Sequence, residues 1–136
     1  MRNGKKKILI VEDDEAMRAL LKDLLDGEGF HTESVSNGFD ALQKIIEASF
    51  DLIITDIQMP RLTGLDILPR IKKLQPQTPV IVITAFGSDE LYRRSLEKGA
   101  TGYLEKPIHI HQLRTLIHKM ISSKEKLIGG QTLLES

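Results

Sequence analysis

Three short runs of uninterrupted apolar residues dominate the hydrophobic pattern of the chain. They cover residues 8–11, 52–54 and 80–83 and are rich in β-branched side chains. Strands that are apolar on both faces are typical of a parallel sheet with helices on both sides. Two weaker strands fit residues 31–35 and 101–104, so the pattern predicts five strands in all.

Between these strands, apolar residues recur at the spacing of a helical face. Four such stripes lie within residues 17–25, 41–46, 65–74 and 113–121. A further helix can begin after Ser88, a good N-cap residue, and end at Gly99. Strand then helix, five times over, predicts an α/β fold: a doubly wound parallel sheet with five helices on its two faces. Five strands favour the flavodoxin-like order 2-1-3-4-5.

The length of 136 residues suits one domain, which we expect over residues 1–121. Residues 122–136 contain Gly129 and Gly130 and are expected to be the end of the last helix followed by a flexible tail or linker. No apolar run approaches the roughly 20 residues that span a bilayer, and the N-terminus lacks a signal-peptide core. A cytoplasmic protein without membrane contact is therefore expected.

Charge and cysteine content exclude several function classes. Lys and Arg number 19, as do Asp and Glu, so the formal net charge is zero and offers no field for nucleic-acid binding. The one basic run, residues 5–7, is better explained as a solvated strand entry. The absence of cysteine rules out disulfides, thiolate metal sites and cysteine nucleophiles.

Polar side chains follow four of the five predicted strands. In an open parallel sheet, ligands bind outside the carboxyl ends of the strands, so these side chains are expected to lie together. They are Glu12, Asp13 and Asp14 after the first strand, Asp56 after the third, Thr84 after the fourth and Lys106 after the fifth. The sequence thus brings acids, a hydroxyl and an ammonium group to one edge of the sheet.

Clustered carboxylates repel one another, and a hard divalent cation removes that conflict. Magnesium prefers oxygen ligands, so Asp13 and Asp56 are candidate direct ligands, with Glu12 acting directly or through water. Lys106 and Thr84 are suited to two oxygens of a phosphoryl group. An oxygen of Asp56 could then attack phosphorus to form an aspartyl phosphate.

Four motifs stand in order along the chain. They are ILIVEDD at residues 8–14, DLIITDIQMP at 51–60, the proline-to-TA segment at 79–85 and GYLEKP at 102–107. Together with Gly64, they resemble the response-regulator receiver domains of two-component signalling, over nearly the whole predicted domain. The resemblance implies a phosphorelay switch that assists only its own phosphorylation and dephosphorylation, rather than an enzyme.

The resemblance also implies roles for individual residues. Asp56 would accept the phosphoryl group from a histidine kinase or phosphotransfer protein, and Thr84 and Lys106 would contact the phosphoryl oxygens. Magnesium would be held by Glu12, Asp13, Asp56 and the backbone carbonyl of Gln58. The family's Lys-Pro bond is commonly cis, which makes Lys106-Pro107 a candidate.

Tyr103 would be the switching aromatic, turning inward when Thr84 moves onto the phosphoryl group. This would alter the face made by the fourth helix, fifth strand and fifth helix, where partners of the family dock. The output would be a downstream protein or a C-terminal domain absent from this chain, and the same face could form a phosphorylation-dependent homodimer. An aromatic residue on such a strand can also serve packing alone.

Some residues near the predicted site have simpler interpretations. Asp14 suits the N-cap of the first helix better than a metal site. His109 and His111, two residues apart at a helix start, point in different directions, so chelation of a metal by this pair is poorly supported.

Two other functions remain possible from the residues alone. A magnesium-dependent phosphatase or phosphotransferase of the haloacid-dehalogenase type would also use an Asp nucleophile. Such enzymes usually carry a second Asp two residues later, where this chain has Gln58, and a substrate cap that is missing here. A receiver-like binding module without phosphorylation is disfavoured because Asp13, Asp56, Thr84 and Lys106 are all present.

Overall fold

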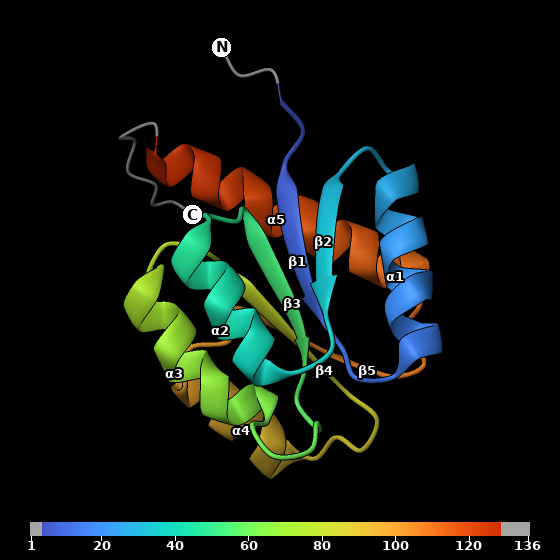
Figure 1. Ribbon diagram of the computed structural model, residues 1–136, viewed down its shortest axis with the longest axis vertical. Helices are drawn as coiled ribbons and strands as arrows, with labels where there is room; N and C mark the ends of the chain where they lie inside the picture. The colour runs from blue at the N-terminus through green and yellow to red at the C-terminus, as the bar shows by residue number, and fades with distance from the viewer. Residues whose placement is uncertain (1–3, 129–136) are drawn as a thin grey trace.

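Strands and helices alternate five times in the protein (Figure 1). The structure is a computed structural model that describes residues 4–128, with side chains over residues 4–122. In chain order the elements are β1 (Lys7–Val11), α1 (Glu15–Gly27), β2 (His31–Val35), α2 (Gly38–Glu47), β3 (Leu52–Asp56), α3 (Gly64–Leu74), β4 (Val80–Thr84), α4 (Asp89–Glu97), β5 (Gly102–Glu105) and α5 (Ile110–Ile128). The predicted α/β class is confirmed.

The five strands form one parallel sheet in the order β2-β1-β3-β4-β5, as predicted. The three middle strands β1, β3 and β4 are almost completely buried. The edge strands β2 and β5 are partly exposed. The unbroken apolar runs of the sequence are therefore the strands that have a neighbour on each side and helices above and below.

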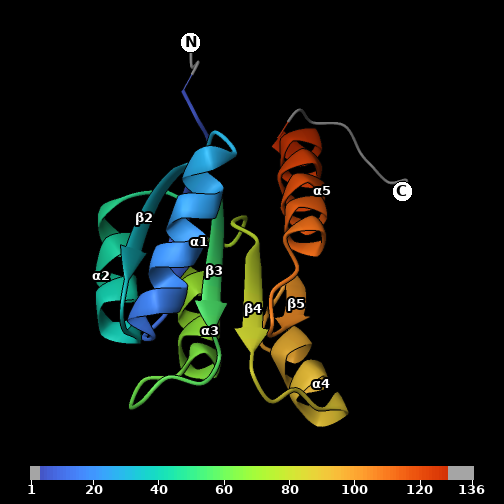
Figure 2. The ribbon, with the colours of Figure 1, turned by 90° about the vertical axis from the view of Figure 1, so that its right-hand side faces the viewer.

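Helices cover both faces of the sheet (Figures 1 and 2). On one face, Ile53 of β3 packs in a core with Ile67 of α3, and Leu91 of α4 lies against that core. On the other face, Ile54 of β3 packs in a second core with Leu113 of α5. Because successive strand residues point to opposite faces, each apolar strand contributes to both cores and fixes the sheet between the helices.

Polar side chains begin the helices whose N-termini face the carboxyl edge of the sheet. Each N-cap side chain accepts a hydrogen bond from a backbone N–H that the first helical turn leaves without a partner. The pairs are Asp14 with Met17, Asn37 with Asp40, Thr63 with Asp66, and Ser88 with Leu91. Asp14 and Ser88 are thus the caps that the sequence predicted.

Two strands extend beyond the apolar runs that predicted them. β3 continues to Asp56 and β4 continues to Thr84, so both polar residues are the last residues of their strands. α5 runs through residue 121 to Ile128, so no change of element marks the domain boundary predicted there, which stays a prediction. The predicted tail at residues 129–136 lies outside the described residues. No helix within residues 4–128 is long and apolar enough to cross a membrane.

Candidate functional site

The carboxyl ends of the strands meet at one edge of the sheet, as the arrowheads of β3, β4 and β5 show in Figure 2. The parallel register places Asp56 of β3 opposite Ile83 of β4, and Thr84 of β4 opposite Glu105 of β5. Glu12 follows β1 directly, and its backbone N–H donates to Val35 O at the end of β2. Residues that are far apart in the chain therefore lie side by side at this edge.

Lys106 joins two buried carboxylates at this edge. Its Nζ lies 3.0 Å from Asp56 Oδ2 and 3.2 Å from Glu12 Oε1. The two carboxylate residues are only 5% and 1% exposed, respectively, so water screens these pairs weakly. The Lys106–Pro107 peptide bond is cis, as the resemblance suggested. Lys106 follows β5, as the sequence predicted, and its ammonium group lies beside Asp56 at the end of β3.

Three carboxylates form a candidate metal site. Glu12, Asp13 and Asp56 each offer an oxygen, and these atoms all lie within 4.8 Å of one another. Asp13 is exposed, whereas the other two are buried, so the cluster opens to solvent on one side. This donor set fits a hard cation such as Mg²⁺, which binds through a few carboxylates and keeps several waters. The backbone N–H of Gln58 donates to Asp56 Oδ1 at 2.8 Å, while the ligand role of its carbonyl stays a prediction.

Burial and neighbouring charges shift the pKa values of two groups at this edge. Burial raises the pKa of Glu12 to about 7, and the Asp56 charge adds to this rise, while the Asp14 N–H and Lys106 oppose it. For Lys106, burial alone would lower the pKa, but the hydrogen bond and charge of Asp56, together with Glu12, raise it. The site therefore holds a permanent positive charge beside an excess of carboxylates.

In the absence of divalent cations, we expect Glu12 to contribute less to stability as pH rises from about 4.5 to about 7. The pKa of Glu12 is about 7 in the folded state against 4.5 for an ordinary Glu, so folding favours its protonated form. That contribution is complete below pH 4.5 and is lost as the carboxyl ionises. Urea unfolding in a chelator at several pH values measures it, with Glu12→Gln as the variant that should flatten this component. A parallel pH profile in both proteins would contradict the assignment.

Gly64 sets how closely the loop after β3 approaches the end of that strand. Its N–H donates to Ile57 O at 3.0 Å. A Cβ at this position would collide with the carbonyl oxygen of Asp56 and stand 2.8 Å from the Cα of Ile57. Both are backbone atoms of the segment that carries the site, so neither can move without displacing Asp56.

We therefore expect Gly64→Ala to lower the free energy of unfolding by about 1–3 kcal/mol, the usual cost of forcing atoms into a packed region. Denaturant unfolding measures the loss. Gly27→Ala is the matched control, because a Cβ there meets nothing within 4 Å and should leave stability unchanged or slightly improved. Equal stability of the two variants would show that the loop adjusts freely.

Thr84 is fully buried and its hydroxyl takes part in a short chain of hydrogen bonds. It accepts from the backbone N–H of Phe86 at 3.2 Å and donates to Gln58 Oε1 at 3.0 Å. The backbone N–H of Ala85 donates to the same Gln58 oxygen at 3.3 Å. The resemblance implied a role for the backbone carbonyl of Gln58, whereas the contact of its side chain with Thr84 could not be located from the sequence; a polar side chain two residues beyond a strand-end Asp was the available signal.

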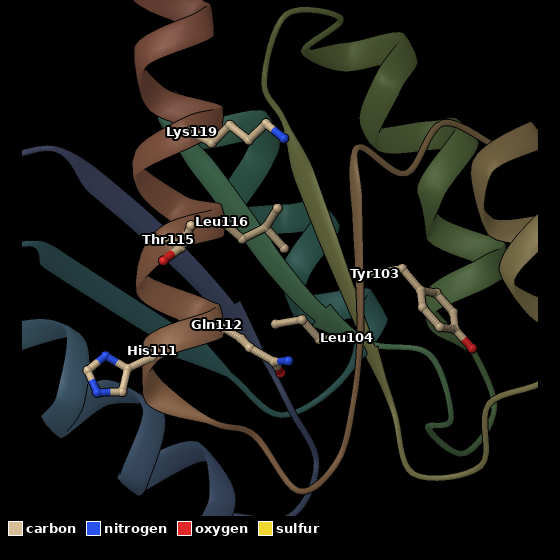
Figure 3. A pocket seen from close by; sticks show the side chains of 7 residues that line it. All are labelled: Tyr103, Leu104, His111, Gln112, Thr115, Leu116 and Lys119. Atoms are coloured by element: carbon tan, nitrogen blue, oxygen red, sulfur yellow. The ribbon is translucent and has the colours of Figure 1, made fainter.

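Tyr103 points away from α5, toward α4 (Figure 3). Its ring meets Tyr92 of α4 edge to face, with centroids 5.2 Å apart. The hydroxyl is shielded from solvent, lies over Gly87 and has no hydrogen-bond partner of normal geometry among the described residues. Burial raises the pKa of Tyr103, although the nearby Ser88 backbone opposes part of the rise. The predicted switch residue is thus half-buried beside the loop that follows Thr84.

A groove beside β5 and the two histidines His109 and His111 lie near the site but are not part of it. A groove of about 450 Å³ runs along β5 and α5 and is lined by Tyr103, Leu104, His111, Gln112, Thr115, Leu116 and Lys119 (Figure 3). His111 Nδ1 lies 3.4 Å from Arg114 Nη1, next to a positive charge. His109 lines a second pocket, which lies at the end of β5. Neither histidine belongs to the acidic cluster.

Comparison with known proteins gives one family. Residues 8–118 match the family model described as response regulator receiver domain. The transcriptional regulatory protein ZraR of Salmonella typhimurium is 36% identical over 122 residues, which are 90% of this chain but 28% of ZraR. The sporulation initiation phosphotransferase F of Bacillus subtilis is 34% identical over 118 residues, 87% of this chain and 95% of that protein. The chain thus spans little more than a quarter of the ZraR relative.

Solved structures agree with the sequence relatives. A response regulator receiver domain protein (CheY-like) from Methanospirillum hungatei matches with a TM-score of 0.87 and 33% identity, over 90% of this chain and 98% of that one. The signal receiver domain of a putative Luxo repressor protein from Vibrio parahaemolyticus matches with the same TM-score, 31% identity, and 95% and 99% coverage. The strand order and the helices on both faces are those expected from such a likeness.

Proposed function

The chain belongs to the response-regulator receiver family of two-component signalling, and we propose that Asp56 is the residue on which it accepts a phosphoryl group. The observation that carries this proposal is the position of the Lys106 ammonium, 3.0 Å from Asp56 Oδ2 at the open edge of the sheet. A buried carboxylate beside a fixed positive charge is suited to a nucleophile whose product carries extra negative charge. The relative of similar length is named a phosphotransferase, which supports the same chemistry.

The donor is a phosphohistidine of a histidine kinase or of a phosphotransfer protein. An oxygen of Asp56 attacks phosphorus, the P–N bond breaks, and its electron pair stays with the imidazole nitrogen, which then takes up a proton. Lys106 offsets the negative charge on one phosphoryl oxygen, and the hydroxyl of Thr84 donates to another. The backbone N–H of Gln58 holds Asp56 Oδ1 in place and leaves Oδ2 toward Lys106.

Glu12, Asp13, Asp56 and the backbone carbonyl of Gln58 would hold Mg²⁺ at this edge. The ion supplies charge neutralisation between the carboxylates and the incoming phosphoryl group. The proximity of three carboxylates and the raised pKa of Glu12 support this assignment, because such a cluster is costly without a cation.

The readout passes from Thr84 to Tyr103. When the hydroxyl of Thr84 turns onto the phosphoryl group, the loop of residues 85–88 follows, and Gly87 lies directly against the Tyr103 hydroxyl. The ring then leaves its edge contact with Tyr92 and turns inward, which changes the surface of α4, β5 and α5. This surface would bind the output partner or a second copy of the chain. An output domain elsewhere in a longer protein is in keeping with the 28% coverage of ZraR.

One experiment separates this function from its two rivals. The full chain is incubated with Mg²⁺ and a small acyl phosphate, and intact mass and backbone amide shifts are recorded. A switch gains one phosphoryl group and shifts amides of β4, α4 and β5. A phosphatase or phosphotransferase turns over unrelated phosphoesters instead, and a module without phosphorylation shows no response. The absence of both adduct and amide shifts would refute the proposal.

A further inference from the structure

The side-chain oxygen of Gln58 accepts hydrogen bonds from two donors at the end of β4, and the proposed reaction uses one of them, the Thr84 hydroxyl. Gln58 Oε1 accepts from Thr84 Oγ1 at 3.0 Å and from the backbone N–H of Ala85 at 3.3 Å. A backbone N–H can only donate, so the atom that faces Ala85 has to be the amide oxygen and not the amide nitrogen. The hydroxyl of Thr84 accepts from the N–H of Phe86 at 3.2 Å, which leaves its own hydrogen for Gln58.

These two donors lie at the end of β4, beside the acceptor strand. Thr84 is fully buried, and the register of β3 and β4 places Asp56 opposite the residue before it. A hydroxyl and a backbone N–H that converge on one oxygen form a small pocket for an acceptor atom. In the unphosphorylated protein a neutral amide oxygen fills that pocket, whereas a phosphoryl oxygen carries negative charge and is the stronger acceptor.

We propose that the carboxamide of Gln58 is an internal competitor of the phosphoryl group, which holds Thr84 and Ala85 in the unphosphorylated arrangement until it is displaced. This inference rests on the proposed function. Gln58 acts here as a positioning residue, because it acts on the reaction through Thr84. Its side chain is exposed, so it can swing into water when a better acceptor arrives.

The backbone of Gln58 links this competitor to the acceptor. Its N–H donates to Asp56 Oδ1 at 2.8 Å, while its side chain reaches Thr84, 26 residues away in sequence. One residue therefore connects the carboxylate that receives the phosphoryl group with the hydroxyl that reports it. A change at Asp56 therefore alters the hydrogen bond to the backbone of Gln58, the residue whose side chain has to release Thr84.

Equilibrium binding of beryllofluoride, with Mg²⁺ at saturation, tests the proposal in the full chain. Gln58→Met keeps the length of the side chain and removes its acceptor. We expect beryllofluoride to bind this variant about two- to tenfold more tightly, since a hydrogen bond that competes with water has a modest net strength. Gln43→Met is the matched control: Gln43 lies on α2, where its amide bonds Glu47, and its loss should leave the affinity unchanged.

A Thr84→Ala background distinguishes competition from simple opening of the site. If Gln58 competes through Thr84, the gain from Gln58→Met shrinks in this background, because only the Ala85 N–H remains to be released. A gain that persists undiminished would mean that the amide merely obstructs entry, and would overturn the proposal. Equal or weaker binding by Gln58→Met in the otherwise native chain would overturn it as well.

The ligand-free protein supplies a second measurement. The amide proton of Ala85 should move upfield and its shift should become more temperature-dependent in Gln58→Met, because its hydrogen bond is lost. An unchanged Ala85 amide would refute the competition alone, leaving phosphorylation of Asp56 intact. Failure of the native chain to bind beryllofluoride at all would instead refute the proposed function and, with it, this inference.

Discussion

Replacing Asp56 with Asn should abolish the phosphoryl adduct completely. The substitution keeps the size of the side chain and an oxygen that can accept the Gln58 N–H, which is 2.8 Å from Asp56 Oδ1 in the native protein. It removes the anionic oxygen beside Lys106 that would attack phosphorus. The measurement is intact mass after incubation with an acyl phosphate and Mg²⁺, where the variant should gain no phosphoryl group and the native chain one.

Asp23→Asn is the control for loss of a carboxylate as such, because Asp23 lies exposed on α1. It should be phosphorylated like the native chain. A phosphoryl adduct in Asp56→Asn would place the acceptor on another group, with Asp13, the exposed member of the acidic cluster, as the first candidate. Peptide mapping of that adduct would identify it.

Replacing Lys106 with Met should slow phosphorylation by about 100-fold or more, the usual loss when one preorganised donor to a developing charge is removed. The native ammonium stands between Asp56 Oδ2 and Glu12 Oε1, and no other ammonium or guanidinium group is paired with either carboxylate within the described residues. Without it, the pKa of Glu12 should rise further above its present value of about 7, because Lys106 is one of the groups that lower it. The rate of adduct formation with an acyl phosphate measures the first effect.

Lys73→Met, on the exposed side of α3, is the matched control and should react at the native rate. A second readout protects the test from a folding defect: Lys106→Met should keep the far-UV circular dichroism of the native protein and still bind Mg²⁺, since the three carboxylates remain. An adduct formed at the native rate would show that Lys106 serves only to pair the carboxylates.

Much of the fold could be predicted because its signals are local or periodic. The runs at residues 8–11, 52–54 and 80–83 are apolar at every position, which only strands buried on both faces require. Alternation with helical stripes then leaves a parallel sheet, and chain connectivity restricts its strand order. The apolar runs alone stop short of the strand ends: Asp56 and Thr84 are the last residues of β3 and β4, since polar groups can end a strand without breaking its hydrogen bonds.

The candidate site could be located for the same reason. Parallel strands all end at one edge, so Glu12, Asp56 and Lys106 had to approach one another once the fold was known. The structure brings them within hydrogen-bond distance, as expected from that rule. Their grouping follows from topology, and the choice of rotamers could not change it greatly.

By itself, the sequence determined the layers, the strand order and the edge at which the chemistry lies. Only the tertiary structure decided that the Gln58 side chain accepts a hydrogen bond from the Thr84 hydroxyl, that Gly64 has no room for a Cβ, and that the Tyr103 hydroxyl lies over Gly87. The physical reason is that the two kinds of information depend on different distances. Hydrophobic periodicity states which face a residue occupies, whereas hydrogen bonds and steric contacts depend on differences of a few tenths of an ångström between atoms of separate elements. Such distances are set by the packing of the whole domain.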